Sequence, residues 1–271
     1  MFNSPQTIRK IAAVFALIVV TTATFLPVQA VAITPKTALV YGDSVTWESR
    51  IATANQFKLK KGWTYTNKSF PGTAPCDWLV NLQSDLATYQ PSIVAIETEG
   101  NNTRPCMLDA NGNVLPKDSQ AYFDKYTADL GSFFAQVTAS GARLLFVKAI
   151  PMKDTTWNNA VNKLNTIGTT LAGQYHGVSV TASPRNAVSA SGKYIDYKTC
   201  LSTEVSAGYC GTDGKIAIRT LTGTQAGIHL CPSGLNAGYP YSCPDAYSSG
   251  EYRFGKTLAN LIVSPPAPVL P

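Results

Sequence analysis

The chain has 271 residues, a formal net charge of +6, and charged side chains at 14% of its positions. This length is enough for one domain with a complete hydrophobic core. The charge is modest, and the sequence contains no long run of lysines and arginines. We therefore expect a globular domain, and we do not expect nucleic acids or strongly acidic molecules among its partners.

The first 32 residues are typical of a secretory signal peptide. Arg9 and Lys10 precede an uncharged, mainly apolar run from Ile11 to Leu26, and the small residues of Ala30-Val31-Ala32 follow at cleavage spacing. An uncleaved membrane anchor is the alternative, since the run approaches the length that spans a bilayer. Removal of the segment lowers the net charge to +4 and leaves no later segment apolar enough to cross a membrane. We expect a secreted protein of the extracellular or cell-wall space.

Short apolar runs then alternate with longer segments of helical periodicity. The predicted strands are Thr37–Tyr41, Trp63–Asn67, Ser92–Glu97, Ala142–Pro151 and Val178–Thr181. The predicted helices are Val45–Phe57, a segment from Trp78 to just before Pro91, Ala121–Ala139 and Trp157–Tyr175. Buried strands separated by helices predict a mostly parallel five-stranded sheet inside a three-layer α/β/α fold. The functional loops of such a sheet lie beyond the carboxyl ends of its strands.

Residues 183–224 break this alternation. They are rich in Gly, Ser, Thr and Tyr, and they carry only weak strand signals at Lys193–Tyr197 and Lys215–Arg219. We interpret them as an insertion at the active edge of the sheet, within a domain of residues 33–263. The proline-rich residues 264–271 predict an extended or disordered tail.

All six cysteines follow the signal segment: Cys76, Cys106, Cys200, Cys210, Cys231 and Cys243. An even number of cysteines in an exported chain predicts disulfides. A sequential pairing is favoured, in which the last two bridges close short loops and the first joins two loops that must meet in space. The chain has only two histidines and no Cys-x-x-Cys pair, so no zinc site is expected. We expect neither a metal nor an organic cofactor.

Four short motifs follow the strands in chain order. They are Gly42-Asp43-Ser44, Gly72, Gly100-Asn101-Asn102, and the segment GIHLCPSG from Gly227 to Gly234. In order and spacing the chain resembles the SGNH/GDSL hydrolases over most of its length after the signal. The resemblance implies a flavodoxin-like fold and ester hydrolysis, with Ser44 as the nucleophile and His229 as the base.

The chemistry of Ser44 fits this resemblance. A serine hydroxyl is a weak nucleophile until a base accepts its proton, and an imidazole is suited to that. At a strand-to-helix turn, Ser44 would also direct its own N–H toward an oxyanion. The resemblance assigns the other donors to the N–H of Gly72 and the side chain of Asn102, with Asn101 as a competitor. A helix cap is the simpler role for a lone serine, but the four motifs together favour catalysis.

The residue that orients His229 is less clear from the sequence. The resembled family has an aspartate three residues before the histidine, where this chain has Ala226. A main-chain carbonyl could hold the imidazole and leave a Ser-His dyad, or Asp213 or Asp196 could fold in from the insertion. Asp43 is expected to hydrogen-bond the amides of its turn. The second histidine, at position 176, is expected to contact the last carbonyls of a helix.

The sequence therefore predicts a secreted serine esterase that forms an acyl-enzyme on Ser44. Its expected substrates are small-molecule, glycan or lipid esters, and we expect a monomer. An O-acyltransferase or deacetylase acting on cell-surface glycans would use the same residues. A different class of function follows if Ala226 marks a decayed site, which would leave a binding protein with an SGNH fold.

Overall fold

The structure is a computed structural model that describes residues 35–223, 226–232, 243 and 249–270. The predicted signal peptide, residues 1–32, lies outside the described residues. Among the helices in the described ranges, none has the length and apolar character needed to cross a bilayer.

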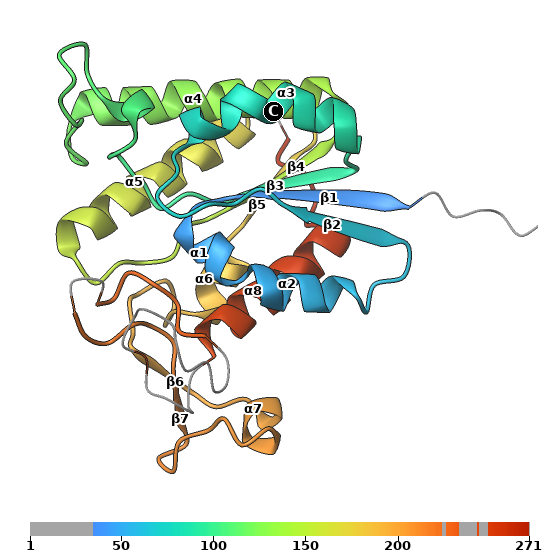
Figure 1. The fold of residues 1–271 in the computed structure, drawn as a ribbon, viewed down its shortest axis with the longest axis vertical. Coiled ribbons are helices and arrows are strands. Elements are labelled where there is room, and N and C mark those ends of the chain that lie inside the picture. The colour runs from blue at the N-terminus through green and yellow to red at the C-terminus, as the bar shows by residue number, and fades with distance from the viewer. Residues whose placement is uncertain (1–34, 224–225, 233–242, 244–248, 271) are drawn as a thin grey trace, which may run out of the picture. The chain divides into compact units, whose positions relative to one another are not determined.

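A five-stranded parallel sheet forms the middle layer (Figure 1), and its strand order is β2-β1-β3-β4-β5. The strands are β1 (Lys36–Tyr41), β2 (Trp63–Asn67), β3 (Ile93–Ile96), β4 (Arg143–Val147) and β5 (Val178–Thr181). This order is that of a flavodoxin-like sheet. The predicted fold class is confirmed, and β2 and β5 have the bounds that the sequence predicts.

Helices cover both faces of the sheet (Figure 1). One face carries α3 (Pro75–Tyr89), α4 (Gln120–Ala139) and α5 (Thr155–Ala172), and the other carries α2 (Arg50–Phe57), α6 (Ser183–Ala187) and α8 (Gly250–Val263). Side chains alternate along each strand, so β1 contributes Leu39 and Tyr41 to the first core and Ala38 and Val40 to the second. The sheet is therefore buried on both faces, as its apolar strands predict.

The predicted helix Val45–Phe57 is in fact two helices. α1 runs over Ser44–Glu48, and α2 begins at Arg50 after a break at Ser49. The hydroxyl of Ser49 donates to the main-chain oxygen of Thr46 at 3.1 Å, a local hydrogen bond that competes with regular helix formation. The last helix, α8, runs over Gly250–Val263.

The segment after α6 forms a small antiparallel pair, β6 (Tyr197–Thr199) and β7 (Lys215–Ala217), with α7 (Ser202–Ser206) between them. It is attached to the sheet domain by two kinds of contact. Ile216 and Ile218 are buried in the second core, and the buried Glu204 accepts a hydrogen bond from Nε of Arg253 in α8 at 2.7 Å. The proline-rich end is extended up to Leu270, and the N–H of Val269 donates to Val178 of β5 at 2.8 Å.

Candidate functional site

Ser44 is the first residue of α1, directly after the turn that ends β1. The turn needs a glycine at position 42, because a Cβ atom there would lie 2.4 Å from the side chain of Thr46. The close approach brings α1 against the end of the sheet. Ser44 is only 7% exposed, and its hydroxyl donates to Oε2 of Glu99 at 3.2 Å.

His229 reaches the same helix through Glu48. Nδ1 of His229 contacts Oε1 of Glu48, and the N–H of Leu230 donates to Oε2 of that carboxylate at 2.9 Å. Glu48 follows Ser44 by one helical turn, so a single short helix carries both side chains. A carboxylate that accepts from Nδ1 fixes the tautomer in which Nε2 is the basic nitrogen.

The residue beside Nδ1 therefore differs from those that the sequence suggests. Asp213 is exposed, and it accepts a hydrogen bond from the N–H of Lys215 at 3.0 Å within its own turn. Asp196 accepts from the hydroxyl of Tyr194 at 2.5 Å. The structure instead places Glu48 against Nδ1 of His229.

Two antiparallel stretches hold the histidine loop in place. The N–H of Thr220 donates to the carbonyl of His229 at 3.1 Å, and the N–H of Cys231 donates to that of Ile218 at 2.9 Å. Between them, the fully buried Arg219 donates to the carbonyls of Pro151 at 2.8 Å and Ile228 at 3.1 Å. The segment interpreted as an insertion thus supports the loop that carries the imidazole.

The loop after β2 also lies beside the nucleophile. The N–H of Phe70 donates to the carbonyl of Gly42 at 3.0 Å, which brings Gly72 close to the turn before Ser44. Gly72 has a φ of +77°, a conformation that favours glycine, and a Cβ atom built on it would meet nothing within 4 Å. The space beside this residue is open to an approaching group.

The two asparagines after β3 have different surroundings from those expected. Nδ2 of Asn102, the expected oxyanion donor, donates to the carbonyl of Leu115 at 2.6 Å. Nδ2 of Asn101 instead faces the site, where it donates to Oδ2 of Asp43 at 3.0 Å and to the carbonyl of Thr73 at 3.3 Å. Asn101 is therefore the asparagine that joins the loops after the first three strands, and the assignment to Asn102 is not supported.

Three buried carboxyl groups gather behind Ser44. Asp43, Glu97 and Glu99 are each at most 1% exposed, and each offers an oxygen within 4.8 Å of the others. Within the described residues, Oδ1 of Asp43 and the Oε1 atoms of Glu97 and Glu99 have no hydrogen-bond partner. Burial raises the pKa of Asp43 to about 6, against the lowering effect of hydrogen bonds from the amides of Glu99 and Val45.

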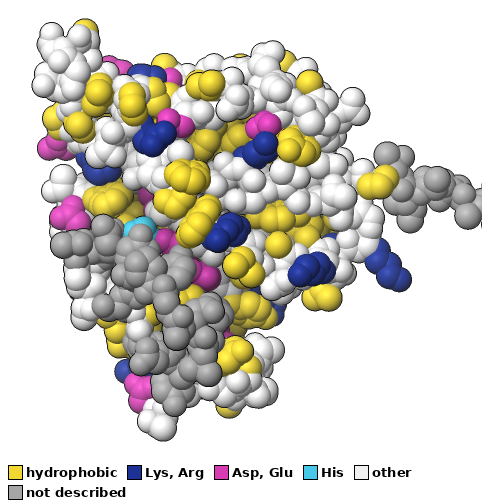
Figure 2. All heavy atoms as spheres, in the orientation of Figure 1, with side chains coloured by type: hydrophobic (Ala, Val, Ile, Leu, Met, Phe, Trp, Pro, Cys, Tyr) yellow, Lys and Arg dark blue, Asp and Glu magenta, His cyan; other side chains and the backbone are white. Residues whose placement is uncertain are grey.

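The other charged groups of the site respond to the same environment. Burial raises the pKa of Glu48, and the hydrogen bond with His229 acts in the opposite direction. Burial lowers the pKa of Arg219 to about 10 and that of Lys117 to about 8. Lys117 donates to the carbonyl of Gly100 and lies 4.2 Å from the ring centroid of Trp157. On the face seen in Figure 2, acidic, basic and apolar side chains are interspersed.

The disulfides join the pairs that the sequence favours: Cys76–Cys106, Cys200–Cys210 and Cys231–Cys243. The first bridge links the start of α3 to the short helix η1 (Pro105–Met107), so it connects the loops after β2 and β3. The third bridge begins two residues after His229. Two of the three bridges thus constrain segments that carry site residues.

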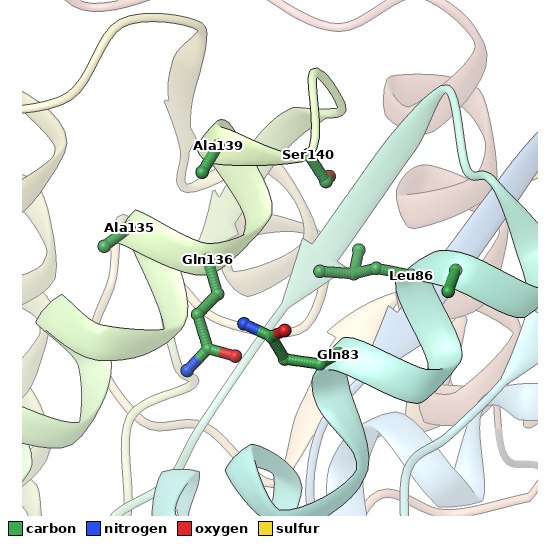
Figure 3. Close-up of a pocket in the computed structure, with 7 residues that line it drawn as sticks. Gln83, Leu86, Ala135, Gln136, Ala139 and Ser140 are labelled. Atoms are coloured by element: carbon green, nitrogen blue, oxygen red, sulfur yellow. The ribbon is translucent and has the colours of Figure 1, made fainter.

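The second histidine lies elsewhere. His176 is exposed and precedes β5, so it lies at the amino end of that strand, away from the loops described above. The surface pocket drawn in Figure 3, with a volume of about 660 Å³, is also remote, because α3 and the last residues of α4 line it near the starts of β3 and β4. Neither feature contributes to the site.

Sequence reasoning missed four members of the site. Glu48 had a signal, since it is the acidic residue one helical turn after Ser44. Glu97 and Glu99 also had one, because acidic residues directly after an apolar strand lie where functional loops begin in a parallel sheet. Arg219 had none, since its burial depends on contacts between segments that are distant in the chain.

Residues 37–205 match the family described as "Protein of unknown function (DUF459)". No curated protein matches the sequence. Among solved structures, a Bacteroides fragilis protein with a proposed acylhydrolase activity is 14% identical, with a TM-score of 0.50 over 84% of this chain and 87% of that one. A catalytic mutant of Axe2, an acetylxylan esterase from Geobacillus stearothermophilus, is 13% identical, with a TM-score of 0.45 over 56% and 79%. TesA is 16% identical, with a TM-score of 0.44 over 72% and 89%. The likeness to the Bacteroides protein is one of fold.

Proposed function

The chain belongs to the DUF459 family, whose description specifies no activity, and we infer its function from its own site. We propose that it is a secreted serine esterase of SGNH type. The contact that carries the proposal is that of Glu48 with Nδ1 of His229 and the N–H of Leu230. This carboxylate lies on the helix that Ser44 begins, and it prepares the imidazole to act as a base.

In the first step, Ser44 Oγ attacks the ester carbonyl carbon, and Nε2 of His229 accepts the hydroxyl proton. The carbonyl oxygen becomes an oxyanion as the Oγ–C bond forms. His229 then gives the proton to the leaving alcohol when the ester C–O bond breaks. Water attacks the acyl-enzyme in the same way, with His229 as the base, and releases the carboxylic acid and Ser44.

Glu48 has the role that an aspartate has in a Ser-His-Asp triad. Its negative charge stabilises the imidazolium that forms when His229 accepts the proton, and its hydrogen bond keeps the ring oriented. The N–H of Leu230 holds the second oxygen of the carboxylate, so the pair is fixed before substrate binds. Ala226, at the position where the resembled family has its acid, is then compatible with catalysis.

The main-chain N–H groups of Ser44 and Gly72 are the proposed first donors to the oxyanion. The positive φ of Gly72 and the open space beside it support this role. Fixed donors stabilise the developing charge without reorganising, and the loss of one such donor typically reduces kcat by about 100-fold or more.

A fluorophosphonate probe tests the proposal directly, because it reacts with an activated serine and not with an ordinary one. We expect the wild type to be labelled and to hydrolyse p-nitrophenyl acetate, with Ser44→Ala unreactive in both assays. Ser49→Ala is the matched control, since Ser49 is a buried serine whose hydroxyl donates to the carbonyl of Thr46. A folded wild type without labelling or hydrolysis would contradict the esterase proposal and favour a binding protein.

A series of p-nitrophenyl esters from acetate to palmitate then measures the preferred acyl-chain length. Transfer to a sugar hydroxyl is followed in the same assay by adding an acetylated or free oligosaccharide and detecting the acylated product. A product ratio that favours transfer over hydrolysis would assign the protein to the acyltransferases.

A further inference from the structure

A glutamate side chain contacts the nucleophile. Nδ2 of Asn102 is engaged by Leu115, and Nδ2 of Asn101 is engaged by Asp43 and Thr73. Glu99 Oε2 instead lies 3.2 Å from Ser44 Oγ. An oxyanion forms on the carbon bonded to Oγ, so Glu99 will be close to the developing negative charge.

The position of Glu99 is fixed by its own main chain. Its carbonyl accepts from Nε1 of Trp157 at 2.6 Å, and its N–H donates to Oδ2 of Asp43 at 2.7 Å. The carboxyl group is at most 1% exposed, so it has little freedom to turn toward water. Glu99 therefore remains beside Ser44 during the reaction.

An ionised Glu99 would oppose the reaction that we propose. A carboxylate next to a developing oxyanion repels it in a site of low dielectric constant, where charges interact strongly. A neutral carboxylic acid has the opposite effect, because its O–H can donate a hydrogen bond to the oxyanion.

The surroundings of Glu99 keep it neutral. Three buried carboxyl groups with oxygens within 4.8 Å of one another cannot all ionise. Among the described residues, one oxygen of each group has no hydrogen-bond partner that would stabilise a negative charge. Burial, followed by the charges of Asp43 and Glu97, raises the pKa of Glu99 well above its usual value, and Arg219 opposes this.

We propose that Glu99 is a catalytic residue that works as a neutral carboxyl group. At rest it accepts a hydrogen bond from the hydroxyl of Ser44, and in the transition state it donates one to the oxyanion. The inference rests on the proposed esterase function. The step involves hydrogen bonds only, because the proton of Ser44 goes to His229 and Glu99 keeps its own proton throughout.

The pH dependence follows from the groups that face Glu99. These are Asp43 from the turn after β1, Glu48 from α1, Glu97 from the end of β3, Lys117 from the segment before α4, and Arg219 from the segment after β7. As the pH rises through the pKa of Glu99, the donor is lost and a repelling charge replaces it, so kcat falls. Lys117 also loses its charge near pH 8. Any change in kcat that comes from Lys117 remains in variants of Glu99.

Two substitutions of nearly equal size test the proposal. Glu99→Gln keeps a neutral donor, so we expect kcat for p-nitrophenyl acetate within about fivefold of the wild type, without the alkaline fall that Glu99 causes. Glu99→Leu removes the donor, so we expect kcat about 100-fold lower with little change in KM. Thermal melts of both variants establish that they fold.

Several outcomes would overturn the role of Glu99. A loss of 100-fold or more in folded Glu99→Gln would mean that the negative charge itself is needed, as for a general base. Equal activity of Glu99→Leu and the wild type would mean that Glu99 gives no help. A rise in melting temperature with Ca²⁺ or Mn²⁺ that Glu99→Gln lacks would assign the carboxyl groups to a cation. An inactive, unlabelled wild type would instead contradict the esterase proposal itself.

Discussion

The two ends of the sheet differ in the groups that they bury. At the carboxyl ends of the strands, Asp43, Glu48, Glu97, Glu99 and Arg219 are all at most 2% exposed. At the amino ends, the pocket between α3 and α4 is lined by Ala, Leu, Gln and Ser, and His176 is exposed. A buried charge destabilises a fold unless it is paired, so a chain without a use for these groups would not need to concentrate them at one end.

The disulfides are also distributed unequally between the two ends. Cys76–Cys106 connects the loops after β2 and β3, and Cys231–Cys243 begins beside the histidine loop. These bridges constrain loops that lack the regular hydrogen bonds of the sheet. The carboxyl end therefore buries more charged groups, and two disulfides constrain its loops.

The sharpest way to separate the two ends is to remove the nucleophile. Ser44→Ala deletes one hydroxyl, and we expect the rate of ester hydrolysis to fall by about 10⁴-fold or more, because the covalent step is lost. Hydrolysis of p-nitrophenyl acetate measures the effect. The melting temperature is expected to stay within a few degrees, since the substitution removes a single hydroxyl, which donates to Glu99. Substantial residual activity would place the reactive serine elsewhere.

Glu48→Gln is expected to have the next largest effect. The amide preserves size but removes the negative charge beside His229, and it can donate to Nδ1 and favour the wrong tautomer. We expect kcat to fall by about 10³-fold, with KM nearly unchanged. Glu204→Gln is the matched control, because Glu204 is an equally buried carboxylate that pairs with Arg253 outside the site. Activity of Glu48→Gln near that of the wild type would favour a dyad without an acid.

Much of the fold follows from the sequence. The strands are short, apolar runs with turn residues between them, so β2 and β5 are predicted to the residue and β1, β3 and β4 to within a few residues. The break at Ser49 was missed because it interrupts a helical pattern at one residue only.

The site was harder to predict than the fold. A motif gives a residue's place in the chain, but the choice between Asn101 and Asn102 depends on which way a tight turn directs each amide. The acid was sought near His229 in the sequence, which lies near the end of the domain, whereas Glu48 lies near its start. Its contact with the imidazole joins residues with a sequence separation of 181, so no local pattern indicates it.

Removal of the Cys76–Cys106 bridge tests how much the disulfides at the carboxyl end contribute to the stability of the fold. The bridge closes a loop with a sequence separation of 30, so chain entropy predicts a loss of about 3–4 kcal/mol in the free energy of unfolding. The double variant Cys76→Ala/Cys106→Ala, unfolded in urea, measures it. The matched variant Cys200→Ala/Cys210→Ala removes a bridge that closes a shorter loop, with a separation of 10. It is expected to lose less free energy of unfolding. An equal or larger loss there would place the main constraint in the segment after α6.

The buried carboxyl groups also predict how stability responds to pH. Burial raises the pKa of Glu97 well above its usual value, so its contribution is present below about pH 4 and is lost as the pH rises. Glu97→Gln keeps the hydrogen bond from Thr46 but cannot ionise. We expect the variant to gain stability relative to the wild type as the pH rises from 4 to 8. Denaturant unfolding at pH 4 and at pH 8 measures the change. A stability difference between variant and wild type that is the same at both pH values would mean that folding does not shift the pKa of Glu97.

His176→Ala should have the smallest effect, because His176 lies at the amino end of the sheet, outside the site. The side chain is exposed in the turn before β5, so its removal neither opens a cavity nor unpairs a buried group. We expect the free energy of unfolding to stay within about 0.5 kcal/mol of the wild type and kcat to be unchanged. His229→Ala, assayed beside it, is expected to lose nearly all hydrolysis, because the base is removed. A loss of activity in His176→Ala comparable to that in His229→Ala would mean that the chemistry does not lie at the carboxyl end alone.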